Sequence, residues 1–314
     1  MMNKRIGFLI MNFENGGGTE RVTSIIANEL TQNNFDVTVI SCQHGNFCKF
    51  NLNKNVRLYS LNGEQYTSPI KRKLYIEKNL KKYIMKEHID ILIAVDVALY
   101  LYLIPLQIRK ICKCIAWEHF NYYIQPNKMV KVARRLAAEY ANYVVVLGKN
   151  DLNNYLTHYK RVKNVTYIYN PIAVDTSDCS NLTDKRAIAV PDKITGVLSG
   201  SFGIVWDGPS SKSCLGNTGN YLKYNNPHKT SMYLAAGIPV IVWEEAAIAD
   251  FIKSNNVGIV VKSLENLSSE INKITNEQYE LMAKNARKIG EFLRKGYYFK
   301  NSIEHIMKYC IGDN

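Results

Sequence analysis

The chain has 314 residues, enough for two ordinary domains, and its composition of 46% hydrophobic and 21% charged residues excludes a disordered chain. The formal net charge of +13 favours an anionic partner, such as a phosphorylated ligand, an anionic membrane surface or nucleic acid. No apolar run is long enough to span a bilayer, no signal peptide opens the chain, and the seven cysteines lack CxxC spacing. We therefore expect a cytoplasmic protein without a metal site, and the absence of known nucleic-acid-binding signatures disfavours nucleic acid.

Short apolar runs alternate with amphipathic stretches in the first part of the chain. The predicted strands are 6–11, 37–41, 56–61, 91–95, 114–117, 143–147 and 165–169. The predicted helices are 19–32, 69–88, 129–141 and 151–159. This alternation predicts an α/β fold with a parallel, doubly wound sheet, which we expect to occupy a first domain of residues 1–172.

A polar stretch follows Asn170 and Pro171, and we expect the domain junction at residues 173–192. In the second domain, residues 193–314, the predicted strands are 203–206, 240–243 and 258–261. Helices are predicted at 227–236, from about 246, and towards the end, whereas the polar segment 209–226 is assigned neither state. A nucleotide-binding half usually contains two strand–helix units. Only one is clear here, so the second domain is expected to be shortened.

Three glycines, Gly16, Gly17 and Gly18, stand between the first predicted strand and its helix. Glycine permits positive φ and close approach of a ligand, and the helix behind it offers unpaired amides to an anionic or hydroxyl-rich ligand. The turn does not follow the GxGxxG pattern, so it does not predict a dinucleotide site. The alternative is a plain tight turn without a ligand.

A polar pair, Glu118 and His119, directly follows the predicted strand 114–117. Ligands of open α/β sheets bind at the carboxyl ends of the strands. His119 can hydrogen-bond a sugar hydroxyl there, and Glu118 can act as a general base or orient its neighbour. The alternative is a purely structural pair.

The segment around Pro227 is the clearest local signal in the second half. Asn226 is expected to cap a helix whose first residue is Pro227. The free amides of the first turn, together with Lys229, suit a diphosphate, and Gly237 is expected to end the helix. The alternative is a well-capped helix with an incidental lysine.

Two predicted helices are rich in basic residues. Their members are Lys71, Arg72, Lys73, Lys78, Lys81, Lys82 and Lys86 in the first, and Lys128, Lys131, Arg134 and Arg135 in the second. Solvated helix faces explain most such clusters. The more specific alternative is a peripheral contact with anionic lipid.

Residues 1 to about 190 resemble the amino-terminal half of family 4 glycosyltransferases of the GT-B fold. The resemblance rests on GGGTER at 16–21, WEHFN at 117–121, VVVL at 144–147 and YNPI at 169–172. It implies two Rossmann-like domains facing a cleft. It further implies that the turn with Gly16, Gly17, Gly18 and Arg21 lies on the acceptor side of the cleft, and that His119 contacts the transferred sugar.

Residues 202 to about 262 resemble the carboxyl-terminal domain of bacterial β-1,6-galactofuranosyltransferases and of UDP-glucosyltransferases that modify serine-rich adhesins. The matching segments are FGIVWDG at 202–208, GNYLKYNNPHK at 219–229 and AAIADF at 246–251. This resemblance implies a UDP-sugar substrate. It also implies that Tyr224, Asn226, His228 and Lys229 line the UDP pocket.

The two resemblances together imply transfer of a hexosyl unit from a UDP-sugar in surface-polysaccharide or glycoprotein synthesis, with no cofactor. The expected acceptor is a saccharide, a lipid-linked saccharide or a glycoprotein, and further expected partners are the inner face of the membrane and a second copy of the chain. A retaining reaction needs no general base, so His119 would only position the sugar. An inverting one makes Glu118 or Asp96 the candidate base.

The alternative is a catalytically inactive glycosyltransferase remnant, produced by fusion or deletion, that binds a saccharide or a partner protein. The run 187–190 resembles the first strand of the second domain, but the Arg/Lys pair that follows this strand in family 4 is absent. The paired glutamates of that family are absent as well. These departures keep the remnant open as an alternative.

Overall fold

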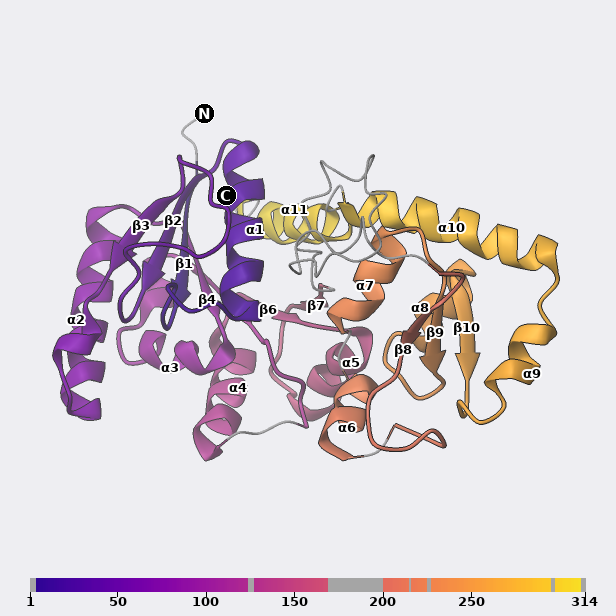
Figure 1. The fold of residues 1–314 in the computed structure, drawn as a ribbon. Helices are drawn as coiled ribbons and strands as arrows, with labels where there is room; N and C mark the ends of the chain where they lie inside the picture. The colour runs from indigo at the N-terminus through magenta and orange to yellow at the C-terminus, as the bar shows by residue number, and fades with distance from the viewer. Residues whose placement is uncertain are drawn as a thin grey trace. The chain divides into compact units, whose positions relative to one another are not determined.

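The computed structural model describes residues 4–123, 127–168, 200–214, 216–224, 227–294 and 297–311. The chain forms two compact units (Figure 1). The first contains Met1–Leu147, Asp151–Tyr167 and Glu304–Asn314, and the second contains Gly148–Asn150 and Ile168–Ile303. The expected junction at 173–192 lies outside the described residues. After the second unit, the chain ends in the first unit with Glu304–Asn314. The strand pattern does not predict this.

The first unit is built on a seven-stranded parallel sheet of order β3-β2-β1-β4-β5-β6-β7. The strands are β1 Arg5–Ile10, β2 Asp36–Ser41, β3 Arg57–Ser60, β4 Ile91–Val95, β5 Lys113–Trp117, β6 Tyr143–Val146 and β7 Val165–Tyr167. Every predicted strand of this half is confirmed to within two residues, and so is the α/β class. The apolar runs are continuous because helices cover both faces of a parallel sheet.

Helices connect the strands of the first unit. They are α1 Gly18–Gln32, α2 Pro69–Lys86, α3 Tyr100–Leu103, α4 Lys128–Tyr140 and α5 Lys149–His158, with short 3₁₀ turns η1 Gly63–Gln65, η2 Val97–Leu99 and η3 Ile108–Lys110. Apolar side chains of α2, α3 and α4, including Leu80, Leu103 and Ala137, share one core with Leu92 and Cys114 of the sheet. These three helices therefore cover the same face, and a right-handed crossover from β1 to β2 puts α1 on the other.

In the described part of the second unit, the sheet has three parallel strands in the order β10-β9-β8. The strands are β8 Gly203–Val205, β9 Val240–Trp243 and β10 Gly258–Val261, and the helices are α6 Gly216–Tyr224, α7 His228–Ala235, α8 Ala249–Asn255, α9 Leu267–Asn272 and α10 Asn276–Arg294. Helix α11, Tyr297–Ile311, follows. Gly203 is needed where it stands, because a Cβ atom there would lie 2.2 Å from Cγ of Tyr233 on α7.

Helix α6 corrects the sequence analysis, which assigned neither helix nor strand to the polar segment 209–226. Leu222 on this helix and Cys214 just before it are buried in the core of the second unit. Gly219 lets the helix pack tightly, since a Cβ atom there would lie 2.3 Å from the carbonyl oxygen of Cys214. Burial of a few apolar residues thus outweighs the low helix propensity of the Gly- and Asn-rich segment.

Candidate functional site

The glycine turn leads directly into α1, with Gly17 as the N-cap residue. Positive φ, which glycine permits, is not used here: Gly17 has φ −88°, and neither Gly16 nor Gly18 has a positive φ. The N–H of Gly17 donates to Oε2 of Glu20 at 3.0 Å, and a Cβ atom at Gly17 would lie 2.6 Å from that oxygen, so a larger residue here would displace the Glu20 side chain. All three glycines are exposed, so a ligand can approach the first turn of α1.

The loop after β2 lies beside the glycine turn and adds residues that sequence reasoning missed. Carboxylate Oε1 of Glu14 accepts hydrogen bonds from the N–H groups of Gly45 and Asn46, both at 2.9 Å. The guanidinium carbon of Arg21 lies 5.4 Å from the centre of the Phe50 ring, and burial lowers the pKa of Arg21. These residues could have been found from the predicted strand order, because loops at the carboxyl ends of neighbouring parallel strands meet at one edge of the sheet.

Glu118 is fully buried at the end of β5 and is paired with Arg134 of α4. Nε of Arg134 donates to Oε2 of Glu118 at 2.5 Å, and the Tyr155 hydroxyl donates to the same oxygen at 3.2 Å. The N–H of Phe120 donates to Oε1 at 2.8 Å. Burial raises the pKa of Glu118, while Arg134 opposes the rise. Both carboxylate oxygens already accept hydrogen bonds, which suits an orienting group better than a general base.

Arg134 holds the loop that follows β5 through its whole guanidinium group. Besides Glu118, it donates from Nη1 to the carbonyl oxygen of Tyr122 and from Nη2 to that of Asn121, each at 2.9 Å. The side chain is completely buried. Sequence analysis placed Arg134 in a basic surface cluster, and this assignment is wrong. The residue lies on the apolar face of α4, three or four positions from Val130 and Ala137, because it pairs with a buried carboxylate.

A second buried carboxylate supports the same loop. Oδ1 of Asp151 accepts a hydrogen bond from the N–H of Tyr122 at 3.0 Å. Asp151 has no exposed surface, and among the described residues nothing forms a hydrogen bond with its Oδ2. Burial raises the pKa of Asp151. Sequence reasoning missed this residue, which carries no motif and lies near the start of α5.

His119 sits in the loop that Arg134 holds. Its ring stacks on Trp117 with a centroid distance of 5.3 Å, and its Nε2 is buried with no hydrogen-bond partner in the described part of the chain. Burial lowers the pKa of His119 to about 4, so the imidazole is neutral at pH 7. A buried ring nitrogen without a partner is costly unless a ligand supplies one. This supports a ligand at the carboxyl end of β5.

Asp96, the other candidate base, follows the neighbouring strand β4. Its backbone is strained, with φ 96° and ψ 123°. Its N–H donates to the carbonyl oxygen of Trp117 at 3.0 Å, and its Oδ1 accepts from the N–H of Ala98 at 2.9 Å. Burial raises the pKa of Asp96. Positive φ in an aspartate is of the kind found at functional sites, where surrounding structure enforces it.

In the second unit, α7 begins at His228, and Pro227 is its N-cap residue rather than its first helical residue. The extended ψ of 143° at Pro227 explains this one-residue correction. Asn226 lies outside the described residues, and Tyr224 ends α6. Nζ of Lys229 lies 2.7 Å from Oδ1 of Asp207. Gly237 ends the helix with φ 76°, as predicted.

A second lysine lies in the same region of the unit. Nζ of Lys223 lies 2.6 Å from Oε2 of Glu245 and 5.1 Å from the centre of the Trp243 ring. Asp207 and Glu245 follow β8 and β9, so both ion pairs form beyond the carboxyl ends of parallel strands. Sequence reasoning missed Lys223 and both carboxylates, because the pairs become visible only once the strand order is known. An anionic ligand at this edge would compete with these carboxylates for the two lysines.

Two family profiles match the sequence, and each covers about half of it. Residues 16–176 match Glycosyltransferase Family 4. Residues 144–306 match the Glucosyltransferase 3-like, C-terminal domain. Both matches agree with the resemblances inferred from the motifs.

Among curated relatives, the chain is similar to the β-1,6-galactofuranosyltransferase WbbI of Escherichia coli strain K12. The two are 42% identical over 118 residues, which are 37% of this chain and 35% of WbbI. It is also 34% identical over 119 residues to glucosyltransferase 3 of Streptococcus gordonii, covering 37% of this chain and 34% of that enzyme. The matched segments thus span about a third of the length of these relatives.

Solved structures resemble the fold over almost the whole chain. Sucrose-phosphate synthase of Thermosynechococcus elongatus superposes with a TM-score of 0.65 at 11% identity, covering 99% of this chain and 100% of that one. HepE of Anabaena gives a TM-score of 0.61 at 12% identity, covering 98% of this chain and 100% of that one. The chain belongs to the GT-B glycosyltransferases, with a Glycosyltransferase Family 4 amino-terminal region and a Glucosyltransferase 3-like C-terminal domain.

Proposed function

We propose that the protein transfers a hexosyl unit from a UDP-sugar to a saccharide acceptor during synthesis of a surface polysaccharide or glycoprotein. The observation that carries the donor side is the pair of lysines, Lys223 and Lys229, beyond the carboxyl ends of β8 and β9. They lie within the region that matches the Glucosyltransferase 3-like domain. The solved HepE complex contains UDP and glucose, which supports a UDP-sugar as the donor class.

The first turn of α7 suits the diphosphate of such a donor. Its free amides and the positive end of the helix dipole attract an anion, and Lys229 adds a full charge from the same turn. The hydroxyl of Thr230 is buried without a hydrogen-bond partner among the described residues, so it can donate to a phosphate oxygen. These groups would also stabilise the UDP leaving group as charge develops on it. The roles of Tyr224, Asn226 and His228 in the UDP pocket stay predictions.

We expect Lys229→Ala to weaken UDP binding by roughly 10- to 150-fold, because a charge-assisted hydrogen bond contributes about 1.5–3 kcal/mol. Isothermal titration calorimetry with UDP measures the change. Lys253→Ala, a matched loss of an exposed lysine on α8, should leave binding unaltered. Asp207→Asn removes the competing carboxylate and should strengthen binding. Unchanged affinity in Lys229→Ala, or an equal loss in Asp207→Asn, would refute this assignment of the donor site.

On the acceptor side, we propose that the glycine turn and Arg21 receive the saccharide, while neutral His119 hydrogen-bonds the transferred sugar. Glu118 then orients the His119 loop through Arg134 rather than removing a proton, since both of its oxygens are engaged. If the reaction retains configuration, no base is needed. If it inverts, Asp96 is the remaining candidate base.

Contact with an anionic membrane surface is part of the proposal and rests on α2. Its exposed side includes Ile70, Leu74 and Met85, which are 74%, 60% and 55% exposed, together with Lys71, Lys78 and Lys82. Such a mixture of apolar and basic residues suits a helix that lies in the headgroup region. Arg72 and Lys73 do not contribute, because Arg72 donates to the carbonyl oxygen of Tyr66 and Lys73 pairs with Glu77. No helix of the described chain is long and apolar enough to cross a bilayer.

We expect Lys78→Glu/Lys82→Glu to weaken binding to phosphatidylglycerol vesicles by about 4 kcal/mol at low salt, since each basic residue near such a surface contributes about 1 kcal/mol and reversal doubles the change. Vesicle sedimentation measures this, with phosphatidylcholine vesicles as the control lipid. Lys253→Glu/Lys288→Glu is the matched charge change in the second unit. If both double variants lose the same affinity, net charge rather than α2 governs the contact.

The absence of the Arg/Lys pair and the paired glutamates of family 4 motivates the alternative, a remnant that binds a saccharide or a partner protein without transferring sugar. Calorimetry with UDP and assays of UDP-glucose and UDP-galactose hydrolysis and transfer separate the two. UDP binding with turnover supports the transferase. Absence of both would exclude the transferase.

A further inference from the structure

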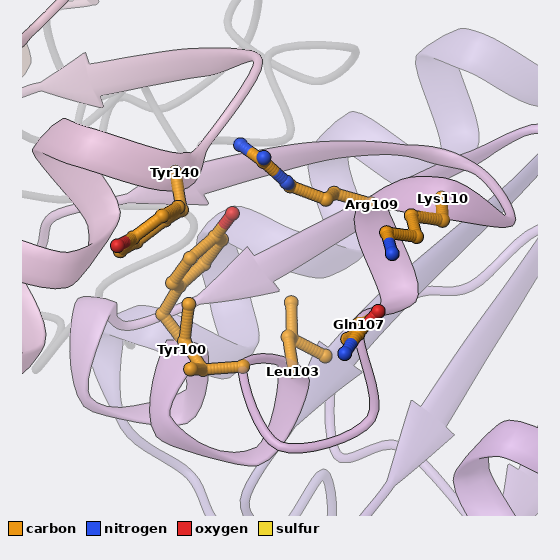
Figure 2. A pocket seen from close by; sticks show the side chains of 7 residues that line it. Tyr100, Leu103, Gln107, Arg109, Lys110 and Tyr140 are labelled. Carbon is orange, nitrogen blue, oxygen red and sulfur yellow. The ribbon is translucent and has the colours of Figure 1, made fainter.

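A cavity of about 250 Å³ opens on the first unit between α3, η3 and the end of α4 (Figure 2). Leu103, Ile104 and the rings of Tyr100 and Tyr140 form its apolar lining. Arg109 and Lys110 of η3 precede β5, and Tyr140 precedes β6, so the cavity lies towards the amino ends of these strands. His119 follows the carboxyl end of β5. The cavity is therefore separate from the candidate site for sugar transfer.

Three polar side chains stand around the apolar lining, and none of them has a hydrogen-bond or ion-pair partner among the described residues. They are Gln107, Arg109 and Lys110, and the guanidinium carbon of Arg109 lies 5.2 Å from the centre of the Tyr140 ring. Gln107 has a left-handed backbone with φ 49°. Two cations that no described carboxylate neutralises, beside an apolar hollow, favour an anion with an apolar part.

Tyr100 adds a hydroxyl group from the buried side. The residue is only 1% exposed, but its hydroxyl oxygen is not one of the fully buried polar atoms that lack a partner, so it can be reached from the cavity. Figure 2 shows this hydroxyl pointing towards the side of the cavity where Arg109 and Tyr140 lie. Burial raises the pKa of Tyr100, so the group stays protonated and can donate a hydrogen bond.

We propose that this cavity binds a small amphipathic anion, consisting of an aromatic ring or short aliphatic chain that carries a phosphate or carboxylate. The apolar part would contact Leu103, Ile104 and the Tyr140 ring, and the anionic group would meet Arg109, Lys110 and the Tyr100 hydroxyl. A volume of about 250 Å³ suits such a ligand and is below the roughly 300–1,000 Å³ of drug-sized sites, so it does not suit a nucleotide sugar.

Such an anion could be a free metabolite or the headgroup end of a lipid. Arg109 and Lys110 also border a second, more open hollow of about 650 Å³ that includes Met85 and Ile111. These two apolar side chains are 55% and 38% exposed, so a chain leaving the first cavity would meet further apolar surface. The two sources share the same chemistry in the cavity and differ only in the length of the apolar part.

Titration calorimetry on the full chain tests the proposal with phenyl phosphate as the free anion and dihexanoylphosphatidic acid, below its micelle concentration, as the lipid. Phenol and inorganic phosphate are the matched halves of the first probe. We expect at least one amphipathic probe to bind about tenfold or more tightly than phenol or inorganic phosphate. Phenol lacks the charge-assisted contact and inorganic phosphate lacks the apolar burial, and each loss weakens binding by about tenfold or more. The probe that binds more tightly identifies the source.

Two variants then locate the binding. Arg109→Gln removes an exposed charge, and Ile104→Trp fills the cavity from a half-buried position; each should weaken binding at least tenfold while the urea midpoint of unfolding stays unchanged. Lys284→Gln on α10, an exposed lysine outside the cavity lining, is the matched surface control and should bind like the wild type. The proposal is overturned if neither amphipathic probe binds, or if binding survives in both cavity variants. Because UDP is not part of the test, its outcome is independent of the proposed transferase activity.

Discussion

Replacing Arg134 with methionine is expected to lower the free energy of unfolding by about 3–5 kcal/mol, because it leaves the carboxylate of Glu118 buried without its charged partner. The substitution also removes the donors to the carbonyl oxygens of Asn121 and Tyr122. Methionine fills part of the space, so the loss comes mainly from the unpaired polar groups. Urea unfolding followed by tryptophan fluorescence measures it, with Trp117 next to the affected residues as a reporter.

Arg135→Met is the matched control, since Arg135 lies one position further along α4 and is exposed. It should change the unfolding free energy by less than about 0.5 kcal/mol. Arg134→Lys should fail to restore stability, because one ammonium group cannot reproduce the fork of the guanidinium group towards three acceptors. Glu118→Leu combined with Arg134→Met should cost less than the sum of the single changes. Equal effects of Arg134→Met and Arg135→Met would show that the buried pair does not stabilise the fold.

The inner strands of the first unit, β1, β2, β4, β5 and β6, could be predicted from the sequence because both faces of the sheet are buried there. A strand such as β4 is then a continuous apolar run bounded by polar residues, which distinguishes it from the amphipathic helices on either side. The same reasoning located Glu118 and His119 at the end of β5. It failed at α6, where two buried positions, rather than a periodic apolar stripe, hold a Gly- and Asn-rich helix in place.

The partners of the site residues were harder to predict than their positions. Arg134 occupies an apolar-stripe position of α4, which is a sequence signal for a buried arginine, but the sequence alone does not identify Glu118 as its partner. The pairs Lys229–Asp207 and Lys223–Glu245 likewise join residues about 22 positions apart in the chain. Such pairs depend on which strands are neighbours. Sequence patterns therefore indicated where the charged residues stand, whereas tertiary structure decides which of them are neutralised.

His119→Ala is expected to reduce kcat for sugar transfer about 100-fold, the order of loss that follows from misplacing a reacting group by about 1 Å. UDP affinity, measured by calorimetry, should stay unchanged, since the proposed UDP pocket lies in the other unit. His119→Gln should recover part of kcat, because an amide can hydrogen-bond a sugar hydroxyl. Loss of UDP binding together with transfer would contradict the role assigned to His119.

The titration of His119 gives a second, independent readout of the same residue. Its pKa of about 4 in the folded protein lies below the ordinary value of 6.5, so between these pH values the unfolded chain binds a proton that the folded chain does not. The corresponding stability is fully present above about pH 6.5 and is lost as the pH falls towards 4. The urea midpoint should therefore fall more between pH 7 and pH 5 in the wild type than in His119→Gln, because the variant lacks this proton uptake. An equal fall of the urea midpoint in the two proteins would mean that the surroundings do not keep His119 neutral. It would also remove the argument that His119 Nε2 binds a ligand.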